Sequence, residues 1–331
     1  GLAIASGADA PGRAVREPEP VTNPPSFRSH LRLGERTLDL ARPLLMGVVN
    51  ANPDSFSDPG ERPLDAQLDQ VRALVAECAT VIDVGGQSGI TNVAEVHPDV
   101  EITRVVPLVA AIVAELPGVV VSVDTYKPPV VEAVLDAGAH IVNDVSGLRA
   151  PELAPLVARH GAALVVMHTA APPKTRLQDT DLYGNVVAEV GAFLTAKTAE
   201  AVAAGVHPES ILLDPGPDFT KTPAQTVEVL RHLNDLNPDG LPMLLAISRK
   251  DFIGALTRTR PRERLAGTLA AVAAVGSGSG VVLRVHDVGE VRRFLTVLDV
   301  LRSTDPVDPD LRLTDDLRWA AGRPDGTVAQ P

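Results

Sequence analysis

Short runs of aliphatic residues recur along the middle of the chain, and each is followed by a segment with helical spacing. Eight such runs are candidate strands: Leu45–Val49, Val81–Val84, Val119–Val123, His140–Val145, Ala163–Met167, Ile211–Leu213, Met243–Ile247 and Val281–Val285. In the segments between them apolar residues lie three or four positions apart, as in Asp65 to Cys78, which is typical of amphipathic helices. Uniformly apolar strands alternating with helices indicate a parallel sheet covered on its outer face. We therefore predict an α/β fold, a (β/α)8 TIM barrel, with a doubly wound open sheet as the alternative.

Polar residues stand at the ends of nearly all these runs, and they favour the barrel. They are Asn50, Asp83, Asp124, Asn143, Asp144, His168, Asp214, Ser248, Arg249, Lys250, Arg284 and His286. In a barrel they would converge on one C-terminal mouth, whereas an open sheet would spread them along an edge. Any one of them could instead cap a neighbouring helix, but a shared ligand site accounts better for the whole set. For His168 the alternative is packing, and Lys221 is a further candidate for the mouth, with solvent exposure as its alternative.

The two ends of the chain differ in composition from this middle part. Residues 1–30 contain five prolines among Gly, Ala and charged residues, without any hydrophobic period. Such a segment cannot bury enough apolar surface to offset the entropy lost on ordering. We expect a disordered tail over residues 1–30, one barrel domain over residues 31–302 and an acidic tail over residues 303–331.

Composition narrows the class of protein. There are 42 Asp and Glu against 30 Lys and Arg, a net charge of −12, with no basic run, which argues against nucleic-acid binding. The uncharged stretch 265–283 is rich in Gly, Ala, Ser and Thr, so a helix, a turn and a strand explain it better than a membrane span. The single cysteine, Cys78, excludes an internal disulfide, and we expect it to pack within a helix. These features are typical of a cytoplasmic protein.

The strand-end residues combine two kinds of chemistry. Carboxylates and amides, here Asp124, Asn143 and Asp214, accept hydrogen bonds from the N–H edge of a flat heterocycle. Cationic side chains, which bind phosphate oxygens, come from the last strands and would face Asn50. These cations are Lys250, Arg284 and His286. Together the two groups predict a site for a phosphorylated heterocycle.

Segments at the strand ends resemble those of dihydropteroate synthases. In the family's order they are MGVVNANPDSFSDPG (Met46–Gly60), VIDVGGQS (Val81–Ser88), VSVDTYKP (Val121–Pro128), GAHIVNDVSG (Gly138–Gly147), LVVMH (Leu164–His168), LLDPGPDFTKT (Leu212–Thr222), LLAISRKDFIG (Leu244–Gly254) and VLRVHDV (Val282–Val288). The resemblance covers about Leu40 to Arg302. It implies a (β/α)8 barrel, commonly dimeric, that uses Mg²⁺ in folate biosynthesis. The reaction joins 6-hydroxymethyl-7,8-dihydropterin pyrophosphate to p-aminobenzoate and releases pyrophosphate.

The resemblance also implies roles for individual residues. The residues that would hold the pterin are Asp124, Asn143, Asp214 and Lys250, with Met167 beneath the ring. Asn50 would ligate Mg²⁺ and pyrophosphate, and Arg284 and His286 would hold the phosphates. Because charge builds on the leaving oxygen, these cations would stabilise the transition state more than the substrate.

Departures from the family's pattern cluster on the arylamine side. Where the second loop usually reads Glu-Ser-Thr-Arg-Pro-Gly, this chain has Gln87–Asn92, so the usual arginine is missing. Asp218 replaces a customary glycine beside Phe219, and Asp251 stands where the family usually offers Ser or Arg. Each carboxylate would repel an anionic amine by ~1 kcal/mol or more at an effective dielectric of about 20.

Three interpretations of function remain open at this point. The first is a synthase that condenses the pterin pyrophosphate with p-aminobenzoate or a related arylamine. The second is a divergent paralogue of the actinobacterial type that keeps the pterin pocket but has lost or changed the condensation. A third, a folate-dependent methyltransferase on a related barrel, would not need Asn50, Arg284 and His286 for a pyrophosphate group.

Overall fold

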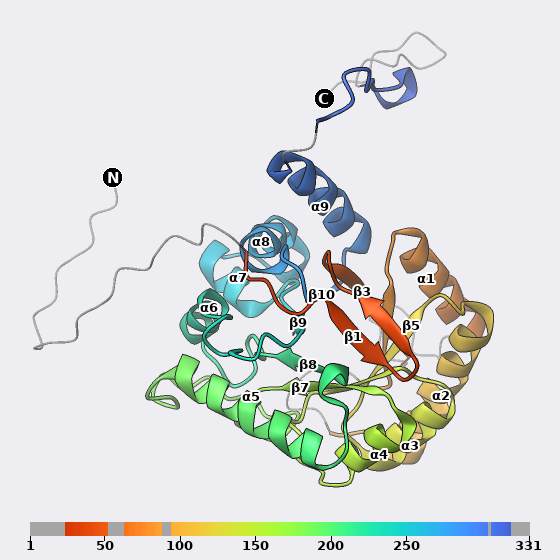
Figure 1. Cartoon of the computed structure of the whole chain (residues 1–331), viewed down its shortest axis with the longest axis vertical. Helices are drawn as coiled ribbons and strands as arrows, with labels where there is room; N and C mark the ends of the chain where they lie inside the picture. The colour runs from red at the N-terminus through yellow and green to blue at the C-terminus, as the bar shows by residue number, and fades with distance from the viewer. Residues whose placement is uncertain (1–23, 52–62, 88–93, 304–305, 319–331) are drawn as a thin grey trace, which may run out of the picture.

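The computed structural model describes residues 24–51, 63–87, 94–303 and 306–318. A closed barrel of parallel strands forms its centre, in the order β10-β3-β4-β5-β6-β7-β8-β9 (Figure 1). The barrel strands are β3 (Leu44–Asn50), β4 (Val81–Gly85), β5 (Val120–Asp124), β6 (Ile141–Asp144), β7 (Ala163–Met167), β8 (Ile211–Asp214), β9 (Met243–Leu245) and β10 (Val281–Val285). The prediction of a TIM barrel, and of its eight strands, is confirmed.

Helices surround the barrel on its outer side (Figure 1). They are α1 (Leu64–Ala76), α2 (Pro98–Glu115), α3 (Pro128–Asp136), α4 (Leu153–His160), α5 (Val186–Ala203), α6 (Pro223–Arg231), α7 (Asp251–Thr257), α8 (Leu265–Ala271) and α9 (Val288–Arg302). Outward-facing strand residues such as Ile82 and Val84 are fully buried in one hydrophobic cluster with the inner faces of these helices. Short helical turns complete the layer: η1 (Pro208–Ser210), η2 (Pro261–Glu263), the π turn η3 (Val272–Gly276) and η4 (Asp315–Leu317).

Alternation along each strand sends every second side chain into the barrel. Val81, Val120, Ile141, Val165, Leu212 and Val282 belong to a second buried cluster, which fills the barrel interior. Asp83 lies two residues after Val81 on the same face of its strand, and Arg284 lies two residues after Val282. The same spacing puts further polar and sulfur-containing side chains on the interior face, at the C-terminal ends: Asp124, Asn143, Met167 and Asp214.

A hairpin that the sequence analysis did not predict covers the opposite end of the barrel. Strands β1 (His30–Leu33) and β2 (Arg36–Asp39) pair antiparallel, and Leu31 and Leu33 are buried in the interior cluster. The segment before the hairpin also packs: Phe27 is 7% exposed and its N–H donates to the Ser279 carbonyl at 2.9 Å. The folded part thus begins earlier than the expected boundary at residue 31, and residues 1–23 lie outside the described residues.

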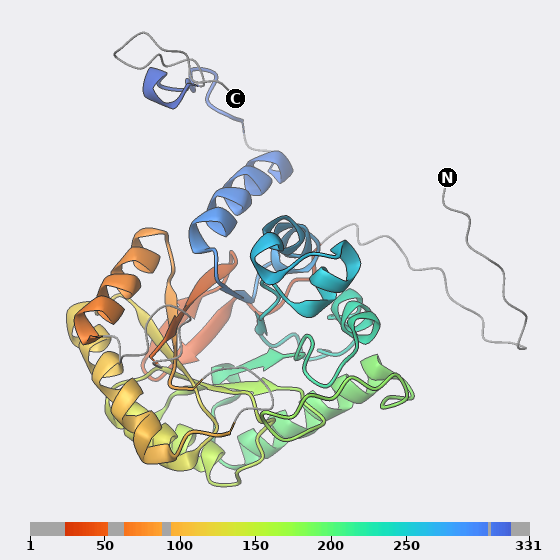
Figure 2. The same ribbon diagram turned by 180° about the vertical axis from the view of Figure 1, so that it is seen from behind.

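The last helix leaves the barrel (Figures 1 and 2). The first half of α9 is anchored by the buried Val288, Val291 and Leu295, whereas Val297 and Leu301 are exposed. Of the acidic tail, residues 304–305 and 319–331 lie outside the described residues. Across the described ranges, none of the helices has the length and apolar character that crossing a membrane requires.

The expectation for Cys78 is wrong. Helix α1 ends at Ala76, and Cys78 is exposed in a left-handed backbone conformation, with φ of 76°. The helical spacing was extended two residues too far, because Ala79 and the strand β4 that follows are apolar as well.

Candidate functional site

Strands β4 to β8 bring acidic and amide side chains together inside the mouth of the barrel. Asp83, Asp124 and Asn143 stand near the ends of three adjacent strands, with Asp124 directly beside Asn143 in the register. Met167 at the end of β7 pairs with Asp214 at the end of β8, and both are nearly fully buried. The predicted convergence is therefore observed for these residues, whereas the buried Asp144, one position after Asn143, accepts the N–H groups of Ser146 and Leu148 in the following loop.

Asp83 is the centre of the polar network. Its fully buried carboxylate accepts hydrogen bonds from the Ser122 hydroxyl at 2.7 Å, the Asn143 amide at 3.3 Å and the Arg284 Nε at 2.7 Å. A second nitrogen of Arg284 reaches Asp124 at 3.3 Å. The guanidinium is thus fixed by two carboxylates, which sets its orientation at the base of the mouth.

Burial raises the pKa of both acidic groups that face the open mouth. Loss of hydration raises the pKa of Asp124 to about 7, with repulsion from Asp83 adding to it and Arg284 opposing it. Loss of hydration also raises the pKa of Asp214, whose carboxylate accepts the Gly216 N–H at 2.7 Å. Carboxylates in such surroundings are stabilised in the charged form by a ligand that donates N–H groups.

Asn143 carries an unused acceptor. Its amide nitrogen donates to Asp83, but its buried Oδ1 has no hydrogen-bond partner among the described residues. A buried polar atom without a partner costs free energy, so a bound ligand with a donor would be stabilised here.

The cationic side of the mouth is formed by the loops after β9 and β10. The His286 Nδ1 lies 3.0 Å from the Ser248 hydroxyl. Loss of hydration, followed by the nearby guanidinium groups of Arg284 and Arg249, lowers the pKa of His286 to about 4. His286 is therefore neutral near pH 7 rather than the predicted cation, and it can hold a phosphate oxygen only as an N–H donor. The Arg249 guanidinium makes two bonds to the Asp287 carboxylate, so its charge is already compensated.

A cavity of about 420 Å³ opens beside this group. Its lining comes from the loops after β7, β8, β9 and β10 and includes Arg176, Asp218, Phe219, Lys250, Asp251, Arg284 and His286. The Lys250 ammonium lies 4.6 Å from the centroid of the Phe219 ring, within cation–π range. Loss of hydration lowers the pKa of Lys250, and the nearby Asp218 and Asp214 oppose this.

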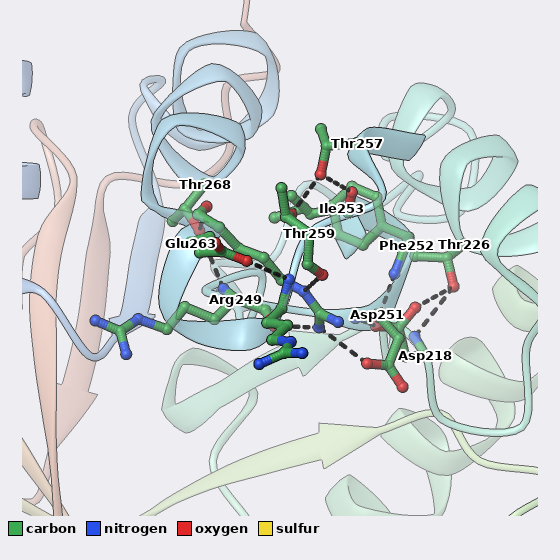
Figure 3. Close-up of polar contacts among 12 residues, drawn as sticks. Asp218, Thr226, Arg249, Asp251, Phe252, Ile253, Thr257, Thr259, Glu263 and Thr268 are labelled. Atoms are coloured by element: carbon green, nitrogen blue, oxygen red, sulfur yellow. Dashed lines mark hydrogen bonds and ion pairs between the residues drawn. The ribbon is translucent and has the colours of Figure 1, made fainter. Parts of the chain in front are cut away.

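Asp218 has a structural role that its sequence position does not reveal. Its Oδ2 accepts the backbone N–H groups of Asp251 at 2.6 Å and Phe252 at 3.3 Å, so it caps the start of α7 (Figure 3). Its Oδ1 accepts the Thr226 hydroxyl at 3.1 Å. Asp251 is also engaged, since Arg264 donates to its carboxylate at 2.9 Å. The two charges expected to be free in the site are therefore both held by partners of the chain.

Lys221 organises the loop that carries Asp218 and Phe219. Its fully buried ammonium lies 2.8 Å from His168 Nδ1 and donates to the carbonyls of Gly216 at 3.0 Å and Phe219 at 3.1 Å. Loss of hydration on burial lowers the pKa of the Lys221 ammonium to about 7, because it outweighs the attraction of the nearby Asp214 carboxylate. Gly216 is required because a Cβ there would lie 2.1 Å from the His168 carbonyl oxygen. His168 and Lys221 thus hold the loop together behind the cavity wall.

The base of the second loop is tied to the loop after β5. The Gln87 amide donates to the Tyr126 hydroxyl at 3.1 Å, and the Lys127 ammonium lies 3.4 Å from Gln87 Oε1. Lys127 also makes a buried ion pair of 2.7 Å with Glu101. Gln87 is therefore anchored, while residues 88–92 of the altered loop lie outside the described residues.

Asn50 is the residue expected to ligate a metal ion. It is exposed at the end of β3, with its Oδ1 directed toward Gly85, where a Cβ would lie 3.7 Å away. Within the described ranges, no group of three or more His, Cys, Asp or Glu side chains forms a metal site. Asn50 offers one amide oxygen, which fits Mg²⁺ where substrate phosphates supply further oxygen ligands.

The family model described as "Pterin binding enzyme" matches residues 46–286. These residues run from the third residue of β3 to just beyond the end of β10 and include every strand-end side chain described above. The chain belongs to the pterin-binding enzyme family. The resemblance found in the sequence motifs is thereby confirmed.

Individual members of the pterin-binding enzyme family are similar over most of their length. A dihydropteroate synthase from Synechocystis sp. is 38% identical over 279 residues, 83% of this chain and 96% of that protein. A Mycobacterium tuberculosis protein named inactive dihydropteroate synthase 2 is 40% identical over 277 residues, 82% of this chain and 86% of that protein. The solved structure of Xanthomonas albilineans dihydropteroate synthase with 4-aminobenzoic acid has a TM-score of 0.75 and 38% identity, covering 84% of this chain and 99% of that one.

The sequence analysis listed Asp83 among the strand-end residues of the mouth but gave it no role at the centre of a polar network, and it did not identify the Lys127–Glu101 pair. A charged residue inside an otherwise apolar strand, as in Val81-Ile82-Asp83-Val84, was the available signal for Asp83. Glu101 gave no such signal, because an acidic residue in the first turn of a helix is ordinarily an exposed one.

Proposed function

We propose that the chain catalyses a dihydropteroate-synthase-type condensation of 6-hydroxymethyl-7,8-dihydropterin pyrophosphate with p-aminobenzoate or a related arylamine. The observation that carries the proposal is the meeting of the acceptors Asp124, Asn143 and Asp214 with Arg284 at the barrel mouth, beside an open cavity. This combination matches a ring with N–H donors that also bears phosphates. Membership in the pterin-binding enzyme family and the similarity to dihydropteroate synthases support the same reaction.

The pterin would lie across the mouth with Met167 beneath it. Asp124 and Asp214 would accept the amino and ring N–H groups, the free Oδ1 of Asn143 would take another donor, and Lys250 would donate to the ring carbonyl. N–H donors favour the ionised carboxylates, so pterin binding should lower the raised pKa of Asp124.

The pyrophosphate would face the cationic side of the mouth. Arg284 and His286 would hold its oxygens, and Asn50 would hold Mg²⁺ that arrives with it. Bound Mg²⁺ supplies charge stabilisation at the leaving oxygen. Because Arg284 is already fixed by Asp83, its guanidinium needs no reorganisation as the negative charge develops.

The arylamine would enter through the cavity along Phe219 and Lys250. No protein nucleophile is needed, since the amine itself attacks the methylene carbon.

The homodimer and the cytoplasmic location expected from the sequence stay predictions.

A second candidate, a pterin-binding paralogue without this condensation, is favoured by two observations. Carboxylates of Asp218 and Asp251 line the cavity, and a relative of 40% identity is named as inactive.

One experiment separates the two candidates. Purified protein is incubated with the pterin pyrophosphate, Mg²⁺ and p-aminobenzoate or its amide, and release of pyrophosphate and formation of the pteroate product are measured. Calorimetry with a pterin analogue runs in parallel on the wild type and on Asp214→Asn, which should lose ~1.5–3 kcal/mol of binding because a charged acceptor becomes a mismatched amide. Turnover supports the synthase. Pterin binding without turnover of any amine supports the paralogue, and unchanged affinity of Asp214→Asn contradicts the pocket itself.

A further inference from the structure

We propose that Asp218 determines which amines the cavity accepts, by disfavouring aromatic amines that carry a carboxylate and favouring neutral or cationic ones. The inference rests on the proposed function. It concerns which arylamine this chain takes as its second substrate, an acid such as p-aminobenzoate or a neutral or cationic relative of it.

Asp218 puts a carboxylate into the cavity wall at a fixed position. It is partly exposed and lines the cavity next to Phe219, while hydrogen bonds from Asp251 N, Phe252 N and the Thr226 hydroxyl hold both of its oxygens (Figure 3). The side chain therefore cannot rotate away from an incoming anion without uncapping α7. A carboxylate fixed in this way repels a second carboxylate that approaches along the same wall.

The guanidinium groups nearest this part of the cavity wall, those of Arg249 and Arg264, are paired with carboxylates of the chain. Arg249 extends away from Asp218 in Figure 3 and makes its ion pair with Asp287. Arg264 donates to Asp251, to the Arg249 carbonyl at 2.9 Å and to the Thr259 carbonyl at 3.2 Å. Both guanidiniums are held by carboxylates of the chain, so they offset the repulsion from Asp218 less than unpaired cations would, and the wall disfavours an anionic substituent relative to a neutral or positive one.

Lys250 does not reverse this preference. Its ammonium lies over the Phe219 ring and near both Asp218 and Asp214. An arriving carboxylate would have to compete with two acidic groups for this one ammonium. Arg176 also lines the cavity, but it is exposed on the loop after β7, so solvent screens its attraction for an acidic amine.

The test compares p-aminobenzoate with its isosteric neutral amide, using the full chain with the pterin pyrophosphate and Mg²⁺. The wild type should show the higher kcat/KM with the amide. In Asp218→Asn the ratio of kcat/KM for amide over acid should fall about fivefold or more, which corresponds to ~1 kcal/mol of removed repulsion. Asparagine suits this position, because it tolerates the left-handed backbone, φ 64°, and its amide oxygen can still accept the N–H groups of α7.

Two further variants control the result. Glu132→Gln removes one negative charge on α3, where Glu132 forms an ion pair with the exposed Arg159, and should leave the ratio unchanged. Arg176→Ala should not lower kcat/KM for the acid selectively. An unchanged ratio in Asp218→Asn, or a wild type that prefers the acid and loses that preference in Arg176→Ala, overturns the proposal. Should Asp218→Asn fail to fold, Asp218→Ser, which keeps a capping oxygen without the charge, takes its place.

Failure of the proposed function gives a different experimental result from failure of the charge preference. If neither amine is turned over while the pterin still binds, the condensation is wrong, and the charge preference is then measured by calorimetry of each amine with the pterin-loaded protein. Equal binding of acid and amide there contradicts the role of Asp218, whereas preferential binding of the amide supports it.

Discussion

Replacing Asp83 by asparagine should destabilise the protein far more than replacing an exposed acidic residue. The substitution keeps the shape of the side chain and removes the charge that faces the Arg284 guanidinium at 2.7 Å. It also places an amide donor where Asp83 now accepts from Ser122, Asn143 and Arg284.

The structure sets the size of the effect. Breaking a buried ion pair by removing one partner costs ~3–5 kcal/mol, because the remaining charge is left uncompensated. Here Asp124 still lies 3.3 Å from Arg284 and keeps part of the compensation. We therefore expect a loss of ~2–3 kcal/mol in the free energy of unfolding, about the value of one charged hydrogen bond with a buried partner.

Urea unfolding at pH 7 measures this loss, and two variants serve as controls. Glu132→Gln breaks an ion pair of 3.5 Å whose side chains are 59% and 56% exposed, and should change the free energy of unfolding by less than ~0.5 kcal/mol. The double variant Asp83→Asn with Arg284→Met removes both charges and should be more stable than the sum of the two single losses implies.

Two results would refute this reasoning. One is an Asp83→Asn variant no less stable than Glu132→Gln, which would mean that the network contributes little. The other is strict additivity in the double variant, which would mean that Asp83 and Arg284 do not interact.

Two other predictions concern the anion site and the buried histidine. Arg284→Ala should weaken binding of the pterin pyrophosphate much more than binding of the hydroxymethylpterin alcohol, since only the former has oxygens for the guanidinium; equal losses in calorimetry would make Arg284 purely structural. Burial, followed by the charge of Lys221, lowers the pKa of His168 from 6.5 to about 3. The unfolded state therefore binds the extra proton, and the free energy of unfolding should fall as pH drops from 6.5 toward 3, by up to ~1.4 kcal/mol per pH unit. His168→Gln should show a shallower slope over that window, and an identical slope would contradict the assignment.

The sequence alone determined the barrel architecture and which strand-end side chains lie at its mouth. Strand and helix periods are local, so Val81–Val84 or Val281–Val285 could be identified without knowing their neighbours. Once a parallel barrel is predicted, topology places every strand end at one mouth, which is why Asp124, Asn143 and Asp214 were found together. The sequence did not predict the hairpin at residues 30–39, because its strands are short and the surface on which it packs, the bottom of the barrel, is assembled from distant parts of the chain.

Only the tertiary structure decided which of these side chains are available to a ligand and which are bound by other residues of the chain. Asp83 and Arg284 are 201 residues apart in the chain, and Asp218 reaches the start of α7 from a loop 33 residues earlier. The departures from the family's motifs marked Asp218 and Asp251 as charges that would repel an anionic amine, but the folded chain gives the first a pair of backbone donors and the second an arginine. A hydrogen bond or ion pair depends on distances of a few tenths of an ångström between distant segments, and those distances are fixed by packing of the loops rather than by any local pattern.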